Sequence, residues 1–212
     1  MEKASKGEGP ASCLGDAGPL LLVLSGPSGV GKDSVLKRMQ DLGVPLYYAV
    51  TVTTRPRRPE EVDGVDYRFV TPAEYRAILE SGGFLEHANV YGNLYGIPKE
   101  PIREALAQGR DVIVRIDVQG AATIRRVVPE AVQVFLAPPS LEALEERLRQ
   151  RKTERPDALQ VRIQKAREEM QALSRFDYVV VNEDEKLDAA VERILAIISA
   201  EKCRVCRKPV RL

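Results

Sequence analysis

The sequence predicts an α/β fold, a three-layer core in which a parallel sheet is covered by helices on both faces. Short apolar runs, typical of strands buried on both faces, alternate along the chain with amphipathic helix patterns. The first run, residues 20–24, leads directly into the glycine-rich turn 26–31, and a helix pattern follows the turn. Strand, glycine-rich turn and helix in this order are the context of a phosphate-binding loop, or P-loop.

The P-loop sequence has the chemistry of a site for a di- or triphosphate. Its exposed N–H groups and the positive end of the following helix attract anions, and Lys32 adds a full charge where β- and γ-phosphates would lie. A hydroxyl ligand for Mg²⁺ is expected directly after this lysine, but Asp33 stands there and Ser34 comes one place late. We therefore expect Mg²⁺ at Asp33 or Ser34, and ATP contacts from Gly26, Pro27, Ser28, Gly29, Val30, Gly31, Lys32, Asp33 and Ser34.

The remaining strands are predicted from two kinds of pattern. Residues 111–117, 132–137 and 178–181 are largely apolar, and we expect them to join 20–24 in the buried parallel sheet. Shorter strands are expected at 46–52, at 67–70 after an Asp-Gly turn, and at 84–91 and 94–96 on either side of Gly92-Asn93. Residues 51–97 are therefore expected to form a compact, β-rich insertion in the core.

Helices are predicted where apolar residues recur at helical spacing between capping and breaking residues. Thr71-Pro-Ala-Glu74 has the Thr cap, the Pro at the first position and the Glu at the third that begin a helix. Ser140 caps another helix, and Pro156 separates it from the next. The full set of expected helices is 32–42, 71–81, 98–108, 120–128, one from Ser140, one from Pro156 to about Leu173, and one over 187–198.

The composition is that of a globular chain whose net charge is too small to attract nucleic acid or an anionic membrane. The 212 residues carry a formal net charge of +1, so we expect neither nucleic acid nor a membrane surface as a partner. Three cysteines are too few for a disulfide framework and favour a reducing compartment. We expect residues 1–19 to be disordered, the tail around Cys203 and Cys206 to be frayed, and a cytoplasmic location. A plastid or another organelle is the alternative if a targeting segment has been removed.

A P-loop alone leaves kinase, GTPase and ATPase open. The chain lacks the Asn-Lys-x-Asp motif by which a GTPase normally recognises its base. Two arginine clusters, at 55–58 and 147–162, lie in segments inserted into a small core. This arrangement favours an enzyme that holds phosphates from two sides and moves the terminal one between two bound nucleotides.

From residue 20 to about residue 202 the chain resembles the guanylate kinase family. The resemblance rests on the order and spacing of seven motifs: 25–32 (SGPSGVGK), 53–58 (TTRPRR), 61–67 (EVDGVDY), 84–87 (FLEH), 92–96 (GNLYG), 117–120 (DVQG) and 179–182 (VVVN). It implies Mg²⁺-dependent transfer of a phosphoryl group from ATP to GMP. It also implies a P-loop core at 20–50, 98–140 and 169–202, a GMP-binding domain at 51–97, a helical lid at 141–168 and a tail at 203–212.

The resemblance also implies roles for particular residues. The GMP phosphate would be held by arginine forks and phenol hydroxyls, from Arg55, Arg58, Tyr67 and Tyr95. The guanine base would be held by Glu86, Thr51 and Asp117, because a carboxylate accepts from N1–H and the 2-amino group, which adenine cannot offer together. Arg147, Arg151 and Arg162 would close over the transferring phosphoryl group, and Asn182 would border the adenine. We expect His87 to be structural.

Two positions depart from the family pattern. Ile97 stands where a Ser or Thr usually helps to read the guanine 6-oxo group, so guanine selectivity depends mainly on Glu86. Arg115 stands where the family commonly carries an acid, two residues before Asp117. The start of the P-loop helix and the end of this strand are neighbours in P-loop folds. We therefore predict that Asp33 pairs with Arg115 and supplies the carboxylate that the Mg²⁺ site has otherwise lost.

Two other functions remain open at this point. The chain could be a different nucleoside monophosphate kinase, acting for instance on AMP or dUMP. It could also be a guanylate-kinase-like interaction module that binds phosphopeptides and does not catalyse. Such modules tend to have a degraded P-loop, whereas Gly26, Gly29, Gly31 and Lys32 are all present. The sequence is compatible with a monomer or a homodimer.

Overall fold

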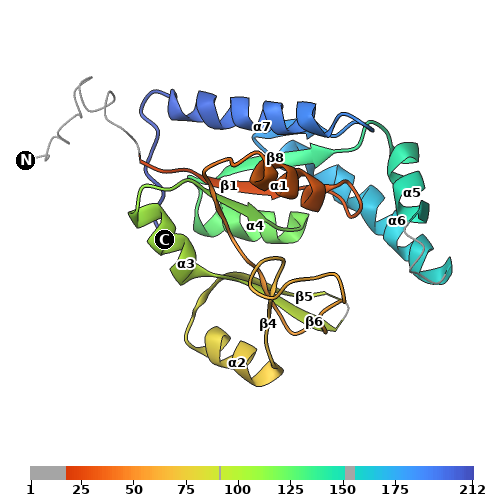
Figure 1. Ribbon diagram of the computed structural model, residues 1–212, viewed down its shortest axis with the longest axis horizontal. Coiled ribbons are helices and arrows are strands. Elements are labelled where there is room, and N and C mark those ends of the chain that lie inside the picture. Colours follow the sequence, from red (N-terminus) through yellow and green to blue (C-terminus); the bar gives the residue numbers. More distant parts are fainter. Residues whose placement is uncertain (1–17, 91, 151–155) are drawn as a thin grey trace, which may run out of the picture.

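The core is a five-stranded parallel sheet with its P-loop strand in the centre. The computed structural model describes residues 18–90, 92–150 and 156–212. The strand order is β2-β7-β1-β8-β9, and every neighbouring pair is parallel. The strands are β1 (Leu21–Ser25), β2 (Tyr47–Tyr48), β7 (Val112–Arg115), β8 (Val132–Ala137) and β9 (Tyr178–Val181) (Figure 1). The predicted α/β class with a parallel sheet is confirmed.

Alternate residues of β1 supply the two hydrophobic cores, one on each face of the sheet. Leu22 and Leu24 pack with α1 (Lys32–Asp41) and α7 (Leu187–Lys202), whereas Leu21 and Val23 pack with α3 (Lys99–Ala107) and α4 (Val118–Val127). All five β1 residues are 0–1% exposed. This burial on both faces of the sheet explains why residues 21–24 are all apolar. Its rigid end therefore holds the P-loop at a fixed place, at the carboxyl edge of the sheet.

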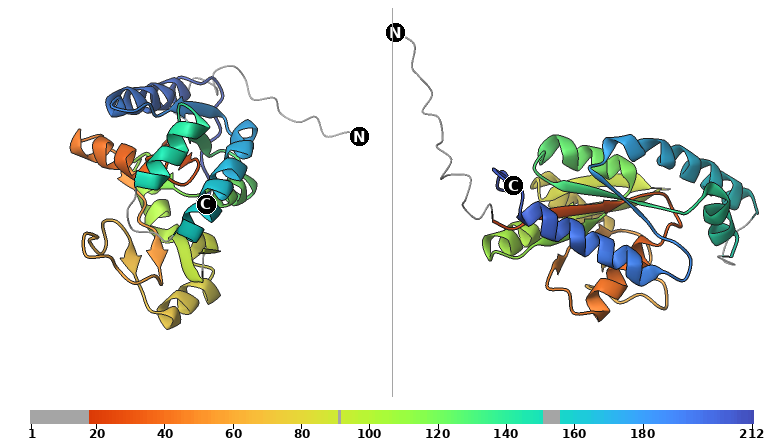
Figure 2. Two further views of the ribbon diagram at one scale, coloured as in Figure 1. Left: turned by 90° about the vertical axis from the view of Figure 1, so that its right-hand side faces the viewer. Right: turned by 90° about the horizontal axis from the view of Figure 1, so that it is seen from above.

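A second, four-stranded sheet lies beside the core, in the order β4-β3-β6-β5. It consists of β3 (Val52–Thr53), β4 (Arg68–Phe69), β5 (Phe84–Val90) and β6 (Asn93–Pro98), with α2 (Pro72–Glu80) packed on it. The left view in Figure 2 places this sheet and α2 on the side of the core opposite α7. The predicted capping box at Thr71 and Glu74 begins α2. The three helical segments α5 (Leu141–Gln150), α6 (Pro156–Met170) and the short 3₁₀ helix Gln171–Arg175 continue from one end of the core.

Two sequence-based expectations about local structure are wrong. The single strand expected over 46–52 is two short strands in different sheets, because the backbone passes from the core at β2 to the smaller sheet at β3. The tail expected to be frayed packs on the core: Val210 and Leu212 contact the α3–α4 side, and Arg207 donates to the carbonyl of Pro19. Apolar residues at the end of a basic tail were the signal for this packing. Among the described helices, none has the length and apolar character of a membrane span.

Candidate functional site

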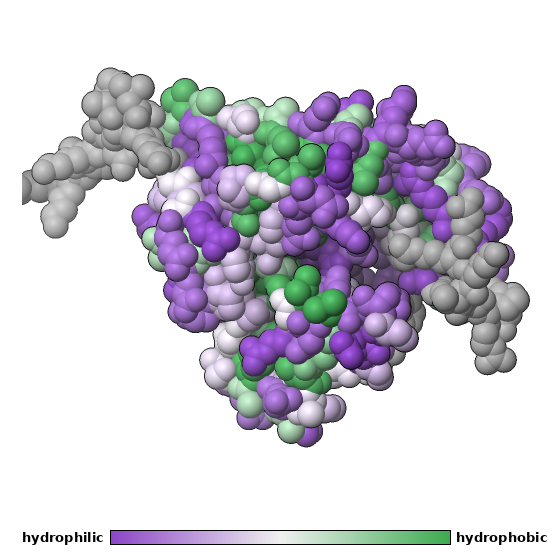
Figure 3. Space-filling view, viewed as in Figure 1, coloured by the Kyte–Doolittle hydropathy of each residue, from purple (hydrophilic) through white to green (hydrophobic). Residues whose placement is uncertain are grey.

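A large pocket lies between the carboxyl edge of the core sheet and the four-stranded sheet. Its volume is about 1160 Å³, and Figure 3 shows the surface hollowed between these two parts, with hydrophilic residues around much of the opening. Residues predicted from the sequence to act on three different groups (donor phosphates, acceptor phosphate and base) line this one space. They are Ser28, Gly29, Val30, Gly31, Lys32, Asp33, Thr51, Arg55, Arg58, Tyr67, Glu86, Tyr95, Asp117 and Arg162.

Glycines give the P-loop its tight path between β1 and α1. Gly26 has φ 142°, and a Cβ there would lie 2.2 Å from the carbonyl oxygen of Leu136. Gly31 has φ 99°, and a Cβ there would lie 2.6 Å from the side-chain amide nitrogen of Asn182. Both the positive φ and the close approach exclude a larger residue. The turn therefore brings its N–H groups and the N-terminus of α1 to the pocket.

Lys32 and Glu169 are charged residues that contact the P-loop backbone. The ammonium group of Lys32 donates to the carbonyl oxygens of Gly26 and Pro27, at 2.6 and 3.0 Å. The backbone N–H of Ser28 donates to the carboxylate of Glu169 at 2.8 Å, so a loop N–H is already directed at an anion. Glu169 is 6% exposed, and burial raises its pKa, opposed by the hydrogen bond from Ser28 and the charge of Lys32.

Sequence reasoning missed Glu169. Its partner Ser28 is 141 positions away, so no local pattern joins the two residues. The signal that would have found it is the spacing of polar residues on α6. Arg162, Lys165 and Glu169 recur at helical intervals, and all three line the pocket.

Arginine and tyrosine side chains gather at the opposite end of the pocket. The Arg55 guanidinium lies 5.4 Å from the ring centroid of Tyr67, and the rings of Tyr67 and Tyr95 are 6.1 Å apart. Glu61 holds Arg55 in place. Its carboxylate accepts a hydrogen bond from Nη2 of Arg55 at 2.6 Å and another from the backbone N–H of Arg58 at 2.9 Å. Burial would raise the pKa of Glu61, but these hydrogen bonds outweigh it and lower the pKa. The arginine fork is thus preorganised by Glu61, for which the sequence predicted no role.

A buried carboxylate marks the third part of the pocket. Glu86 on β5 is 7% exposed, and burial first, then the charge of Asp117, raises its pKa to about 7. Asp117 also caps α4, where its carboxylate accepts from the N–H of Gly120 at 2.8 Å. Ile97 on β6 pairs with Glu86 across the two strands and lines the same pocket, and it is 2% exposed. The exposed His87, which follows Glu86, does not line it.

Several predicted site residues lie outside the lining of this pocket. Arg147 donates instead to Asp184 and to the carbonyl oxygens of Val30 and Asn182, so it fastens the P-loop from behind. Asn182 is buried and donates to the Val30 carbonyl at 2.8 Å. The pocket lining also leaves out Gly26, Pro27 and the exposed Ser34. Arg151 falls outside the described residues.

The predicted contact between Asp33 and Arg115 is present. A guanidinium nitrogen of Arg115 forms an ion pair with the carboxylate of Asp33, and the guanidinium also lies 4.8 Å from the ring centroid of Tyr67. Arg115 is missing from the predicted contacts with nucleotide, although it lines the pocket.

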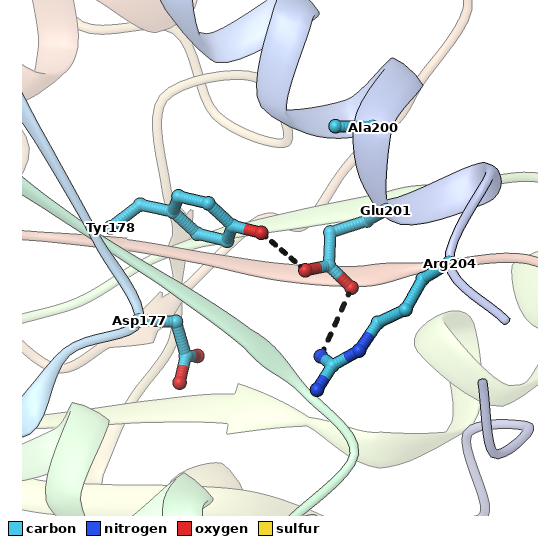
Figure 4. A pocket seen from close by; sticks show the side chains of 5 residues that line it. All are labelled: Asp177, Tyr178, Ala200, Glu201 and Arg204. Carbon is cyan, nitrogen blue, oxygen red and sulfur yellow. Dashed lines mark hydrogen bonds and ion pairs between the residues drawn. The ribbon is translucent and has the colours of Figure 1, made fainter. Parts of the chain in front are cut away.

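A second pocket, of about 520 Å³, lies between β9 and the end of α7 and contains none of the predicted site residues. Figure 4 shows its polar contacts: the Tyr178 hydroxyl donates to Glu201 at 2.5 Å, and Arg204 lies 3.5 Å from the other carboxylate oxygen. These groups neutralise one another and connect β9 to α7. This pocket therefore supports the fold rather than a reaction.

Comparisons with known proteins agree on one family. The family profile described as guanylate kinase matches residues 19–201. Guanylate kinase 2, chloroplastic/mitochondrial, of Oryza sativa subsp. japonica is 48% identical over 92% of this chain and 68% of its own length. The guanylate kinase of Gloeobacter violaceus is 50% identical over 85% of this chain and 87% of its own length.

The fold agrees with the same family. A crystal structure of guanylate kinase from Anaplasma phagocytophilum matches with a TM-score of 0.72 and 32% sequence identity, and the match covers 90% of this chain and 89% of that one. The profile match covers most of the chain, and the P-loop, the arginine–tyrosine cluster and the buried carboxylate line one pocket. The chain therefore belongs to the guanylate kinase family.

Proposed function

We propose that the chain transfers the γ-phosphoryl group of ATP to GMP, forming ADP and GDP. The observation that carries the proposal is a single pocket with a P-loop at one end and the arginine–tyrosine cluster with a buried carboxylate at the other. An NTP-binding site alone would need only the first. The second end suits a nucleoside monophosphate, because its phosphate is a dianion and its base offers hydrogen-bond donors.

Each end of the pocket holds one nucleotide. The P-loop N–H groups and Lys32 bind the donor phosphates, and we assign the acceptor phosphate to Arg55, Arg58, Tyr67 and Tyr95. Phosphoryl transfer needs no covalent intermediate, so catalysis depends on alignment and on positive charge around the group in transit. Arg162 lines the pocket from α6, and we assign it to this group together with Arg151 and Arg147 once α5 and α6 have moved towards the nucleotides.

Guanine is selected by Glu86 in this proposal. Its ionised carboxylate accepts hydrogen bonds from N1–H and the 2-amino group, with Thr51 and Asp117 beside it. A site built around such donors rejects a base without them far more strongly than shape alone does. Ile97 brings no hydrogen-bonding group to this part of the pocket, so the discrimination depends on the carboxylate.

Mg²⁺ fits the donor set at the P-loop. The described residues contain no cluster of three or more His, Cys, Asp or Glu side chains that would hold a metal by itself. Mg²⁺ that arrives with a nucleotide requires only one or two carboxylates besides phosphates and water. Asp33 offers such a carboxylate, with its side chain 67% exposed, and we propose Asp33, with Ser34 as the alternative, as the ligand. When bound, Mg²⁺ neutralises charge on the β- and γ-phosphates.

Asp33→Ala is expected to raise the Mg²⁺ concentration that gives half-maximal rate by about tenfold, because the site loses its charged protein ligand while the phosphates remain. The measurement is the initial rate at fixed ATP over a series of Mg²⁺ concentrations, with Asp41→Ala, at the other end of the same helix, as the control. An unchanged Mg²⁺ dependence would remove Asp33 from the metal site.

Location and assembly are proposals as well. The rice relative is named for chloroplasts and mitochondria, and the Gloeobacter relative is bacterial. We propose a cytoplasmic enzyme, with an organelle as the alternative, that acts as a monomer or a homodimer. The division into core, GMP-binding domain at 51–97 and lid at 141–168 is part of the same proposal.

The direct test is a coupled assay of nucleoside diphosphate formation from ATP with four acceptors: GMP, AMP, CMP and dUMP. We expect kcat/KM for GMP to exceed each of the others by about 1,000-fold or more, as for a site that requires donors on the base. Comparable values for AMP would point to a different nucleoside monophosphate kinase. Absence of both turnover and ATP binding would favour the interaction module.

A further inference from the structure

Arg115 occupies the junction between the two ends of the pocket. It is the last residue of β7 and pairs in register with Leu24 of β1, two residues before the P-loop begins at Gly26. Its side chain contacts Asp33 of the P-loop helix on one side and the ring of Tyr67 on the other. Arg115 therefore touches both the donor-phosphate end and the acceptor-phosphate end.

The contacts of Arg115 leave most of its hydrogen-bonding capacity unused. A guanidinium has five N–H donors. Within the described part of the chain, its one hydrogen bond uses Nη1, to Asp33. Tyr67 contacts the guanidinium through its ring and therefore takes none of these N–H donors. The remaining donors lie in a pocket that, on the proposed function, receives phosphate oxygens on both sides.

The ion pair is not a sufficient reason for a buried cation at this place. The Arg115 side chain is 19% exposed, so most of this charged group is removed from water. Its partner Asp33 is 67% exposed, and such half-solvated pairs contribute little to stability. Taking a guanidinium out of water is costly unless it is well paired. The ion pair and the ring of Tyr67 do not use the remaining donors of this buried guanidinium, which lines the nucleotide pocket.

We propose that Arg115 is a catalytic residue whose guanidinium binds the oxygens of the phosphoryl group as it passes from ATP to GMP, and that Asp33 positions this guanidinium. The inference rests on the proposed function. The phosphoryl group in transit carries its charge on three equatorial oxygens, between the donor and acceptor sites. Arg115 is the pocket arginine that belongs to the rigid core sheet, whereas Arg55 and Arg58 come from a loop and Arg162 from α6. Its charge is therefore in place before α6 moves.

The test compares Arg115→Ala and Arg115→Lys with Arg38→Ala. Arg38 is a matched control. It lies on the same helix as Asp33 and forms an ion pair with Asp188, but it does not line the pocket. For Arg115→Ala we expect kcat to fall about 100-fold, with KM for ATP and GMP changed less than about threefold, because the contact forms in the transition state. Arg115→Lys keeps the charge without the planar fork, and its kcat should fall about tenfold.

Two readouts separate catalysis from a structural role. Millimolar guanidinium added to Arg115→Ala should restore part of kcat, whereas it should restore nothing to Lys32→Ala. In EDTA, Arg115→Ala should also weaken binding of a bisubstrate ligand, in which adenosine and guanosine are joined by five phosphates. Calorimetry should show that Arg115→Ala loses more binding free energy for the bisubstrate ligand than it loses for ATP and for GMP added together.

The outcomes are distinguishable. A wild-type chain without ATP:GMP transfer would overturn the proposed function itself. An active wild type in which both Arg115 variants match Arg38→Ala would overturn the role of Arg115 and leave the proposed function standing. If Arg115→Ala does not fold, the lysine variant decides: a kcat equal to that of the wild type would contradict the inference.

Discussion

Replacing Lys32 with Ala is expected to lower kcat for ATP:GMP phosphoryl transfer about 1,000-fold. In the structure the ammonium group of Lys32 lies within hydrogen-bond distance of the Gly26 and Pro27 carbonyls, so it already lies inside the turn that would hold the β- and γ-phosphates. Its charge offsets the negative charge that moves onto the leaving ADP. The loss should appear mainly in kcat, because this charge develops in the transition state.

Lys37→Ala is the matched control for this prediction. Lys37 is exposed on the same helix and lies outside the pocket, so its removal should leave the turnover number unchanged. The measurement is the steady-state rate of ADP formation at saturating GMP, with circular dichroism to show that both variants are folded. A Lys32→Ala enzyme within tenfold of the wild type would contradict the assignment of the P-loop to the donor phosphates.

The sequence predicted the parts of the site that depend on local chemistry. Gly26 and Gly31 were identifiable because a turn between a buried strand and a helix needs positive φ and close backbone approach, and both features are present. The contact of Asp33 with Arg115 was also predicted, because the two residues stand at the ends of neighbouring elements in any P-loop fold. The topology brings the two positions together, and Arg115 in place of the acid common in the family supplies the opposite charge.

The remainder depends on long-range packing that no local pattern encodes. The carboxylate of Glu169 reaches the P-loop from the end of α6, and Glu61 holds Arg55 across a loop whose path is set by its prolines. Arg147 was expected at the phosphates because it is an arginine of the helical insertion. In the structure it faces Asp184 instead, since the rotation of α5 about its axis is decided by packing. Its role at the transferring phosphoryl group therefore stays a prediction.

Glu86→Gln is expected to raise KM for GMP about 100-fold while making the folded chain more stable at pH 8. Hydrogen bonds to a charged acceptor are worth about 1.5–3 kcal/mol each, and the amide loses the charge and one of the acceptor oxygens. Stability changes in the opposite direction because the pKa of Glu86 is about 7 in the folded chain, against 4.5 as its ordinary value. The folded state therefore holds the proton more tightly than the unfolded state does.

The sign of the pH dependence follows from that difference. Between about pH 4.5 and pH 7 the folded chain binds more protons than the unfolded chain, so its stability falls as the pH rises through this range. At pH 8 the ionised, buried carboxylate costs on the order of 3 kcal/mol, and Gln removes this cost. In thermal unfolding, the Tm of Glu86→Gln should thus be higher than that of the wild type at pH 8 and close to it at pH 4. A lower Tm for the variant at pH 8 would contradict this account.

The same pKa predicts how GMP binding depends on pH. Only the ionised carboxylate accepts both base donors, so KM for GMP should rise about tenfold from pH 8 to pH 6 as Glu86 is protonated. The phosphate of GMP also titrates near pH 6, and the Glu86→Gln enzyme should keep that smaller effect alone. Equal pH profiles for the two enzymes would show that the charge of Glu86 does not select guanine. A steeper profile for the wild type means that the buried carboxylate is retained for recognition at the expense of stability, as binding sites often require.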